Sequence, residues 1–179
     1  MKNTFIVTDT NVFIDLHSVS LLDAFFHLPW EIHTPDYVIK EFTDKDQLTA
    51  LQEFIEIGQL KVNGLQPDDF MVLAQLINSQ RGVSNLSVAD CSVWMLAKKL
   101  ECPLLTGDAK LRAKAKADNI EVHGVLYVFD CLVEYGIIQP QMAAQRLKRL
   151  FNKNHRLPEE HIMSRVAKWE KIMEDSVEK

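Results

Sequence analysis

Short apolar runs alternate with longer segments of helical spacing over the first 136 residues of the chain. A short run without polar alternation is typical of a strand that is buried on both faces, as in a parallel sheet. Such runs predict strands at residues 4–8, 30–34, 102–108 and 120–124, and residues 59–65 form either a strand or an extended connection. Apolar residues that recur every three to four positions predict helices at residues 11–16, 21–28, 35–42, 48–58, 67–82, 86–100, 108–119 and 125–136. Strands that alternate with helices indicate an α/β fold with a mainly parallel sheet.

Polar residues and glycines mark several of the helix ends. Asp36 and Ser87 each precede an apolar stripe and are predicted N-caps, whose side chains accept hydrogen bonds from free N–H groups of the first turn. Gly58, Gly82 and Gly136 are predicted to end the helices before them, because glycine readily adopts the positive φ common at a helix C-terminus.

The pattern changes after Gly136. Residues 140–154 and 157–179 both show helical spacing with a proline near the start, and no strand pattern lies between them. We therefore predict an α/β domain over residues 1–139 and a C-terminal helical extension over residues 140–179, packed on the domain or beside it. The last helix has an apolar stripe that favours packing onto the domain over self-association or a partner protein: Ile162, Val166, Trp169 and Met173.

Composition narrows the class of protein. A length of 179 residues suits one domain with a small addition, and 47% hydrophobic with 25% charged residues is typical of a folded globular chain. The net charge of -5 excludes a globally basic nucleic-acid binder, so contact with nucleic acid would require local positive charge. The three cysteines lack CxxC spacing, which favours reduced thiols. With no signal-peptide pattern and no apolar run of about 18 residues, we expect a cytoplasmic protein that does not contact the membrane.

Four acidic residues stand at positions where chemistry and local structure compete as explanations. Asp9 and Asp108 each follow a predicted strand, where functional groups of parallel sheets gather, but an acid there is also a common turn or cap residue. Asp90 completes the sequence SVAD, which fits a capping box that begins at Ser87, although it also lies near the apolar side of its helix. Glu41 is either a solvated acid on a short helix or a member of the same cluster.

These segments, taken in order, resemble the PIN-domain nuclease family. The quoted segments are FIVTDTNVFIDL, TPDYVIKEF, LSVADCSVWMLAKKL and LLTGDAKL, and the likeness runs from Phe5 to about Ile137. The resemblance implies a three-layer α/β/α sandwich with a mainly parallel central sheet and a cluster of acids that binds Mg²⁺ or Mn²⁺. By position it assigns four residues to the acidic cluster and two to polar roles beside the first and last acid: Asp9, Glu41, Asp90 and Asp108, with Asn11 and Thr106.

The residue types agree with this implication on physical grounds. Mg²⁺ and Mn²⁺ prefer carboxylate, carbonyl and water oxygens, and a divalent ion removes the repulsion among clustered carboxylates. The six histidines are scattered singly, so no zinc spacing competes. We expect Asp9 and Asp108 to coordinate one or two ions, Glu41 and Asp90 to hold metal-bound waters or a second ion, and Asn11 with Thr106 to orient them.

Two groups of basic residues could supply the local positive charge that RNA requires. The first, directly after Asp108, includes Lys110, Arg112 and Lys114, although the sequence slightly favours a solvated helix face there over phosphate contact. The second lies in the extension, where Arg146, Arg149 and Lys153 oppose an apolar stripe.

We hypothesise a metal-dependent endoribonuclease that hydrolyses RNA phosphodiester bonds, with the toxin of a toxin–antitoxin pair as the more specific form. That form adds an antitoxin-like protein partner, and a homodimer is a further alternative. The rival from another class is a non-catalytic PIN-fold interaction module that uses its C-terminal helices to bind a partner. An aspartyl-phosphate phosphatase would need a second aspartate where this chain has Asn11.

Overall fold

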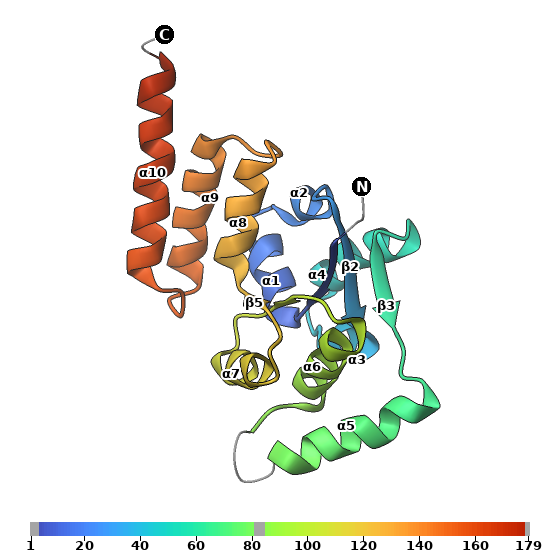
Figure 1. Ribbon diagram of the computed structural model, residues 1–179. Helices are drawn as coiled ribbons and strands as arrows, with labels where there is room; N and C mark the ends of the chain where they lie inside the picture. The colour runs from blue at the N-terminus through green and yellow to red at the C-terminus, as the bar shows by residue number, and fades with distance from the viewer. Residues whose placement is uncertain (1–3, 81–84, 178–179) are drawn as a thin grey trace. The chain divides into compact units, whose positions relative to one another are not determined.

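The computed structural model describes residues 4–80 and 85–177, with side chains up to residue 172 (Figure 1). The chain divides into two compact units. The first comprises Met1–Ile14 and Pro29–Gly124, and the second comprises Asp15–Leu28 and Val125–Lys179. The predicted border at residue 139 between a domain and an extension stays a prediction, since the compact units divide the chain at other positions.

The first unit is built on a parallel sheet. Its five strands lie in the order β3-β2-β1-β4-β5, so the N-terminal strand occupies the centre. Every neighbouring pair is parallel, with Val7 opposite His33 on one side and Leu104 on the other. The strands are β1 (Thr4–Thr8), β2 (Trp30–Pro35), β3 (Leu60–Asn63), β4 (Leu104–Leu105) and β5 (Val122–His123).

Helices flank this sheet. In the described residues α6 packs against β1 and β2, α4 against β3, and α7 against β5. The helices that begin in this unit are α1 (Thr10–Ser18), α3 (Asp36–Lys40), α4 (Lys45–Glu56), α5 (Pro67–Gln80), α6 (Val88–Leu100) and α7 (Ala109–Ala117). A parallel sheet between helices confirms the predicted fold class.

Most of the predicted helix ends are confirmed, and one is wrong. Ser87 caps α6, and Gly58 and Gly136 adopt φ of 75° and 68° after the helices they end. The predicted cap at Asp36 is wrong, because Pro35 occupies the N-cap position and Asp36 is already helical. The Asp36 carboxylate instead accepts a 2.5 Å bond from Lys40 one turn later. The predicted helix end at Gly82 lies outside the described residues.

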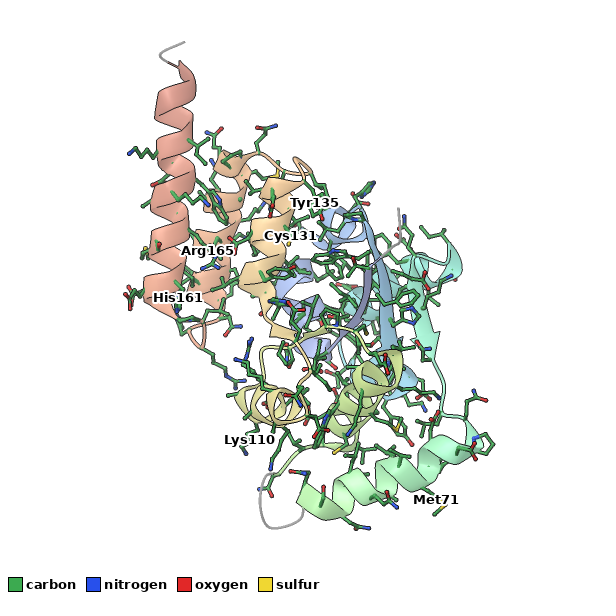
Figure 2. All side chains as sticks on the ribbon, in the orientation of Figure 1. Met71, Lys110, Cys131, Tyr135, His161 and Arg165 are labelled. Carbon is green, nitrogen blue, oxygen red and sulfur yellow. The ribbon has the colours of Figure 1, made fainter. Side chains whose placement is uncertain are left out.

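The second unit is helical. It contains α2 (Leu22–Phe26), α8 (Val125–Glu134), α9 (Pro140–Lys153) and α10 (Glu159–Val177), and the last three lie side by side (Figure 1). The described part of the predicted stripe on α10 is buried, and Trp169 stacks on Phe129 of α8 with ring centroids 6.4 Å apart. Arg165 lies on α10 (Figure 2), and its Nε and Nη2 donate to the Asp130 carboxylate of α8 at 2.9 Å and 2.6 Å. The packing interpretation of this stripe therefore holds for Ile162, Val166 and Trp169, while the Met173 side chain lies outside the described residues.

Two further properties follow from burial and length. All three cysteines are buried free thiols, and burial raises the pKa of both Cys91 and Cys102 to about 11, so neither forms a thiolate near neutral pH. In the described parts of the chain, the helices are too short or too polar to span a bilayer.

Candidate functional site

The candidate site lies at the carboxyl ends of β1 and β4, in the middle of the sheet. The chain builds β2 and β3 on one side of β1 and then β4 and β5 on the other, so the strand order reverses between β1 and β4. Open parallel sheets bind their ligands at such a reversal. Asp9 directly follows β1, and Thr106 directly follows β4.

Asp9 is the most constrained acid of the site. Its side chain is buried, with a relative exposure of 3% for the residue. Oδ1 accepts a 2.7 Å bond from the Thr10 N–H, and Oδ2 accepts bonds of 2.6 Å from Asn11 Nδ2 and 2.8 Å from Thr106 Oγ1. These donors come from the turn after β1 and from the end of β4, so the carboxylate is fixed by both strands.

Burial and neighbouring charges make Asp9 a weaker acid than an aspartate in solvent. Its pKa is raised to about 6, chiefly by burial and also by the carboxylates of Asp90 and Glu41, against the lowering effect of its bonds from Thr106 and Thr10. Asp9 is thus close enough to Asp90 and Glu41 for their charges to act on it. The structure brings these three predicted acids together.

Glu41 lies one residue beyond the last residue of α3, at its C-cap, and not inside the helix as predicted. Its Oε2 accepts a 2.6 Å bond from Thr10 Oγ1, and Ser87 Oγ lies 3.5 Å from its Oε1. Thr10 therefore joins two acids, because its N–H binds Asp9 and its hydroxyl binds Glu41. These contacts turn an exposed glutamate toward the site.

Asp90 satisfies both interpretations of its sequence. It completes a capping box, in which Ser87 N donates to Asp90 Oδ2 at 2.7 Å and Asp90 N donates to Ser87 Oγ at 3.0 Å. The same carboxylate raises the pKa of Asp9. One side chain thus holds the start of α6 and faces the site.

Asp108 is linked to the site through its main chain. Its N–H donates to Thr106 Oγ1 at 3.0 Å, and that hydroxyl donates to Asp9. Its carboxylate caps α7, where Oδ1 accepts bonds of 2.8 Å and 2.7 Å from the N–H groups of Lys110 and Leu111. Asp108 is not among the residues that raise the pKa of Asp9. The fourth predicted acid therefore lies beside the cluster and is directed toward a helix end.

Asn11 connects the two loops of the site. Its Nδ2 binds Asp9, and its Oδ1 accepts a 2.8 Å bond from the Gly107 N–H after β4. A Cβ at Gly107 would lie 3.2 Å from that same Oδ1, so the close approach favours glycine. Asn11 and Thr106 thus have the orienting contacts expected of them, whereas Thr10 and Ser87 are site residues that sequence reasoning missed. The sequence features that could have identified them are the place of Thr10 in the DTN motif and the place of Ser87 as the N-cap of α6.

The donor types of this cluster suit a hard divalent cation. The side chains of Asp9, Glu41 and Asp90 offer only oxygen, and a cation among them would offset the cost of ionising the buried Asp9. Within the described residues, however, no three His, Cys, Asp or Glu side chains converge closely enough to form a recognisable metal site. The donor chemistry fits a metal, but the structure does not show a ligand geometry.

The raised pKa of Asp9 predicts how stability depends on pH. The folded-state pKa of about 6 exceeds the unfolded value of 3.8, so the folded chain binds more protons between these values. The free energy of unfolding in EDTA is therefore expected to fall by about 3 kcal/mol from Asp9 alone as pH rises from well below 3.8 to well above 6, with about 2 kcal/mol of that loss between pH 4.5 and pH 7.5. Urea denaturation of wild type and Asp9→Asn across pH 4.5–7.5 measures this contribution as the change in their difference.

The subtraction matters because burial also raises the pKa of Asp15. That contribution is common to both proteins and cancels. A wild-type-minus-variant difference that stays constant across the range would contradict a buried, ionising Asp9.

The basic residues predicted to contact RNA differ in how free they are. Lys110 projects from α7 into solvent (Figure 2). Arg112 instead donates to the main-chain oxygens of Val122 and Thr106 at 3.3 Å and 3.0 Å, which ties α7 to β5 and to the end of β4. In the second unit, Lys153 donates to the Ser18 oxygen at 2.8 Å. RNA contact stays a prediction for all six residues, including the half-buried Lys114 and Arg146 and the exposed Arg149.

Comparison with known proteins gives a family and a fold. A family model described as a PIN domain matches residues 5–171. The chain is similar in structure to PAE2754 from Pyrobaculum aerophilum, with a TM-score of 0.51 and 17% identity over 73% of this chain and 90% of the other. It is less similar to FitAcB from Neisseria gonorrhoeae, with a TM-score of 0.44 and 15% identity over 65% and 95% of the two chains. It is also similar to VapBC2 from Rickettsia felis, which was solved bound to a DNA fragment from its promoter. That comparison has a TM-score of 0.46 and 12% identity over 68% of this chain and 98% of the other. No curated protein sequence matches significantly.

Proposed function

This chain belongs to the PIN-domain family, and from that premise we propose that it is a divalent-metal-dependent endoribonuclease. The observation that carries the proposal is the buried Asp9 carboxylate, fixed by three hydrogen bonds beside Glu41 and Asp90. Burying an acid among like charges is unfavourable for folding, which is typical of a functional site. The resemblance between FIVTDTNVF and the first motif of PIN nucleases supports the same conclusion.

The four acids are proposed to hold one or two Mg²⁺ or Mn²⁺ ions. A bound ion of this kind activates water and neutralises charge on the scissile phosphate. Thr106 and Asn11 hold Asp9 Oδ2 in one orientation, and Thr10 holds Glu41 Oε2. Asp108 uses Oδ1 for both bonds to α7, so it can keep its cap and contribute Oδ2 to the cluster.

The test is cleavage of a labelled circular RNA, because only an endonuclease opens a circle. Wild type is expected to linearise it in Mn²⁺ or Mg²⁺ and to be inactive in EDTA. Asp108→Asn is expected to lower the rate on the order of 10²-fold, since it removes a carboxylate from the cluster. Asp44→Asn is the matched control, because the exposed Asp44 caps α4 with two bonds from N–H groups, as Asp108 caps α7.

An equal fall in the cleavage rate of the two variants would show that the loss of a helix cap, and not the loss of an acid from the cluster, explains the effect of Asp108→Asn. No opening of the circle by wild type in either metal would refute the endonuclease. Cleavage of only linear, end-labelled RNA would replace it with an exonuclease.

The toxin role is the more specific form of this proposal. It requires an antitoxin-like partner, and a short upstream reading frame with a DNA-binding pattern would support it. A homodimer and cytoplasmic location belong to the same proposal. The rival, a non-catalytic interaction module, gives no reason to keep Asp9 charged and buried.

A further inference from the structure

One surface of the second unit has an unusual combination of charge and shape. A shallow hollow of about 470 Å³ lies on α9, lined by Gln139, Gln141, Met142, Gln145, Arg146 and Arg149. All six residues come from α9 and its N-cap. From Gln139 to Arg149 the surface extends for about 15 Å along the helix. This hollow is hereafter the α9 hollow.

The α9 hollow is positively charged in a protein whose net charge is -5. Its lining contains two guanidinium groups and no carboxylate. Within the described residues, neither arginine makes an ion pair or a hydrogen bond through its side chain, whereas nearby cations do. Lys148 binds Glu170 at 2.6 Å, and Lys153 donates to the Ser18 oxygen at 2.8 Å. Within the part of the chain whose side chains are described, Arg146 and Arg149 are thus the cations of this helix that keep their charge available for a ligand.

The other lining groups indicate what kind of anion fits. Three glutamine amides can donate to and accept from base edges or ribose hydroxyls. Met142, with a relative exposure of 43%, offers an apolar contact for a base face. It is also the only exposed large apolar side chain on the described α9, so this surface lacks the apolar face that a membrane-bound helix needs. Phosphate, base and ribose together are the chemistry of an unpaired RNA strand.

We propose that the α9 hollow is a binding site for single-stranded RNA, separate from the acidic cluster. Arg146 and Arg149 contact phosphates, and Gln139, Gln141 and Gln145 with Met142 contact the bases and riboses. The choice of RNA rests on the proposed function. Lys153, which the sequence pattern placed in the same group, is left out because its ammonium is bonded to main chain.

The test measures binding without cleavage. A fluorescein-labelled single-stranded RNA is titrated with the full chain carrying Asp9→Asn in EDTA, with anisotropy as the readout. Adding Arg146→Ala and Arg149→Ala is expected to weaken binding about tenfold or more at moderate salt. It should also reduce the dependence of log K on log salt by about 1.4, since each phosphate contact on a single strand contributes about 0.7.

The matched control adds Lys168→Ala and Lys171→Ala, which remove the same charge from exposed positions on α10. Binding within about twofold of the parent is expected, and circular dichroism checks that both variants keep their helices. Equal weakening in test and control would overturn the site in favour of general charge attraction. An unchanged affinity after loss of both arginines would also overturn it.

Competition distinguishes RNA from other anions. A polyglutamate of equal charge is expected to displace the RNA poorly, and equally strong displacement would overturn the RNA assignment. Because the measurement does not involve catalysis, arginine-dependent binding in a protein that fails to cut RNA would refute the nuclease and leave the site standing.

Discussion

Cleavage of RNA by the Asp9→Asn variant is expected to fall by a factor on the order of 10³ relative to wild type at saturating Mn²⁺. Asparagine keeps the size of the side chain but removes the charge that interacts with Glu41 and Asp90. Its amide also faces a donor on either side, since Thr10, Asn11 and Thr106 all donate to Asp9. The variant therefore loses both the charge and the orientation of the cluster. Single-turnover cleavage of the circular RNA gives the rate.

Asp15→Asn is the control for this experiment. Asp15 is another partly buried acid whose pKa is raised by burial and lowered by a bond from Asn154. The control is expected to cleave RNA within about twofold of wild type, because Asp15 does not bond to the cluster. Wild-type activity in Asp9→Asn would remove Asp9 from the mechanism, whatever the metal dependence.

Trp169→Ala is expected to lower the free energy of unfolding by about 3–5 kcal/mol. Trp169 is buried, with a relative exposure of 2%, and its ring stacks on Phe129. Removing the indole leaves a cavity between α10 and α8 and removes the stacking contact with Phe129. Urea denaturation followed by far-ultraviolet circular dichroism in EDTA measures the loss as a lower midpoint.

Met163→Ala is the matched change on the same helix. Met163 is 44% exposed, so a loss of about 0.5 kcal/mol or less is expected. If Trp169→Ala were as mild as Met163→Ala, α10 would not be anchored through its apolar stripe.

The fold was predictable because local signals and packing agree along most of the chain. The run FIVT has apolar side chains suited to both faces of a central strand, and β1 is that strand. Ser87 and Asp90 specify the start of α6 from four residues, as the capping box confirms. The prediction that Asp36 is an N-cap was wrong, because the N-cap residue has an extended backbone and Pro35 is the residue with that conformation. The division into compact units depends on the tertiary packing of α8 with α9. Local sequence patterns do not predict such packing.

The site was predictable in its residues but not in its contacts. The order of strands places Asp9 beside Thr106, and sequence motifs name both. The direction of a side chain depends on which nearby donors it can reach in the folded chain. The sequence LLTGD therefore could not predict that the Asp108 carboxylate points toward the start of α7. Thr10 was missed for the same reason, because only the folded chain brings its hydroxyl to Glu41.

Asp90 and Asp108 each belong to the proposed acidic cluster and also stabilise the start of a helix. These two roles affect how relatives of this chain diverge. Each acid stabilises its helix start, because Asp108 is the N-cap of α7 and the Asp90 carboxylate accepts a bond from the N-cap N–H of α6 in a capping box. Selection for folding alone would therefore keep both acids in a descendant that had stopped cutting RNA. Asp9 is different, because its ionised form opposes folding at neutral pH. In a lineage that has lost nuclease activity, Asp9 should therefore be replaced before the other two acids. An acid at this position, more than at positions 90 and 108, then distinguishes an active homologue from an inactive one.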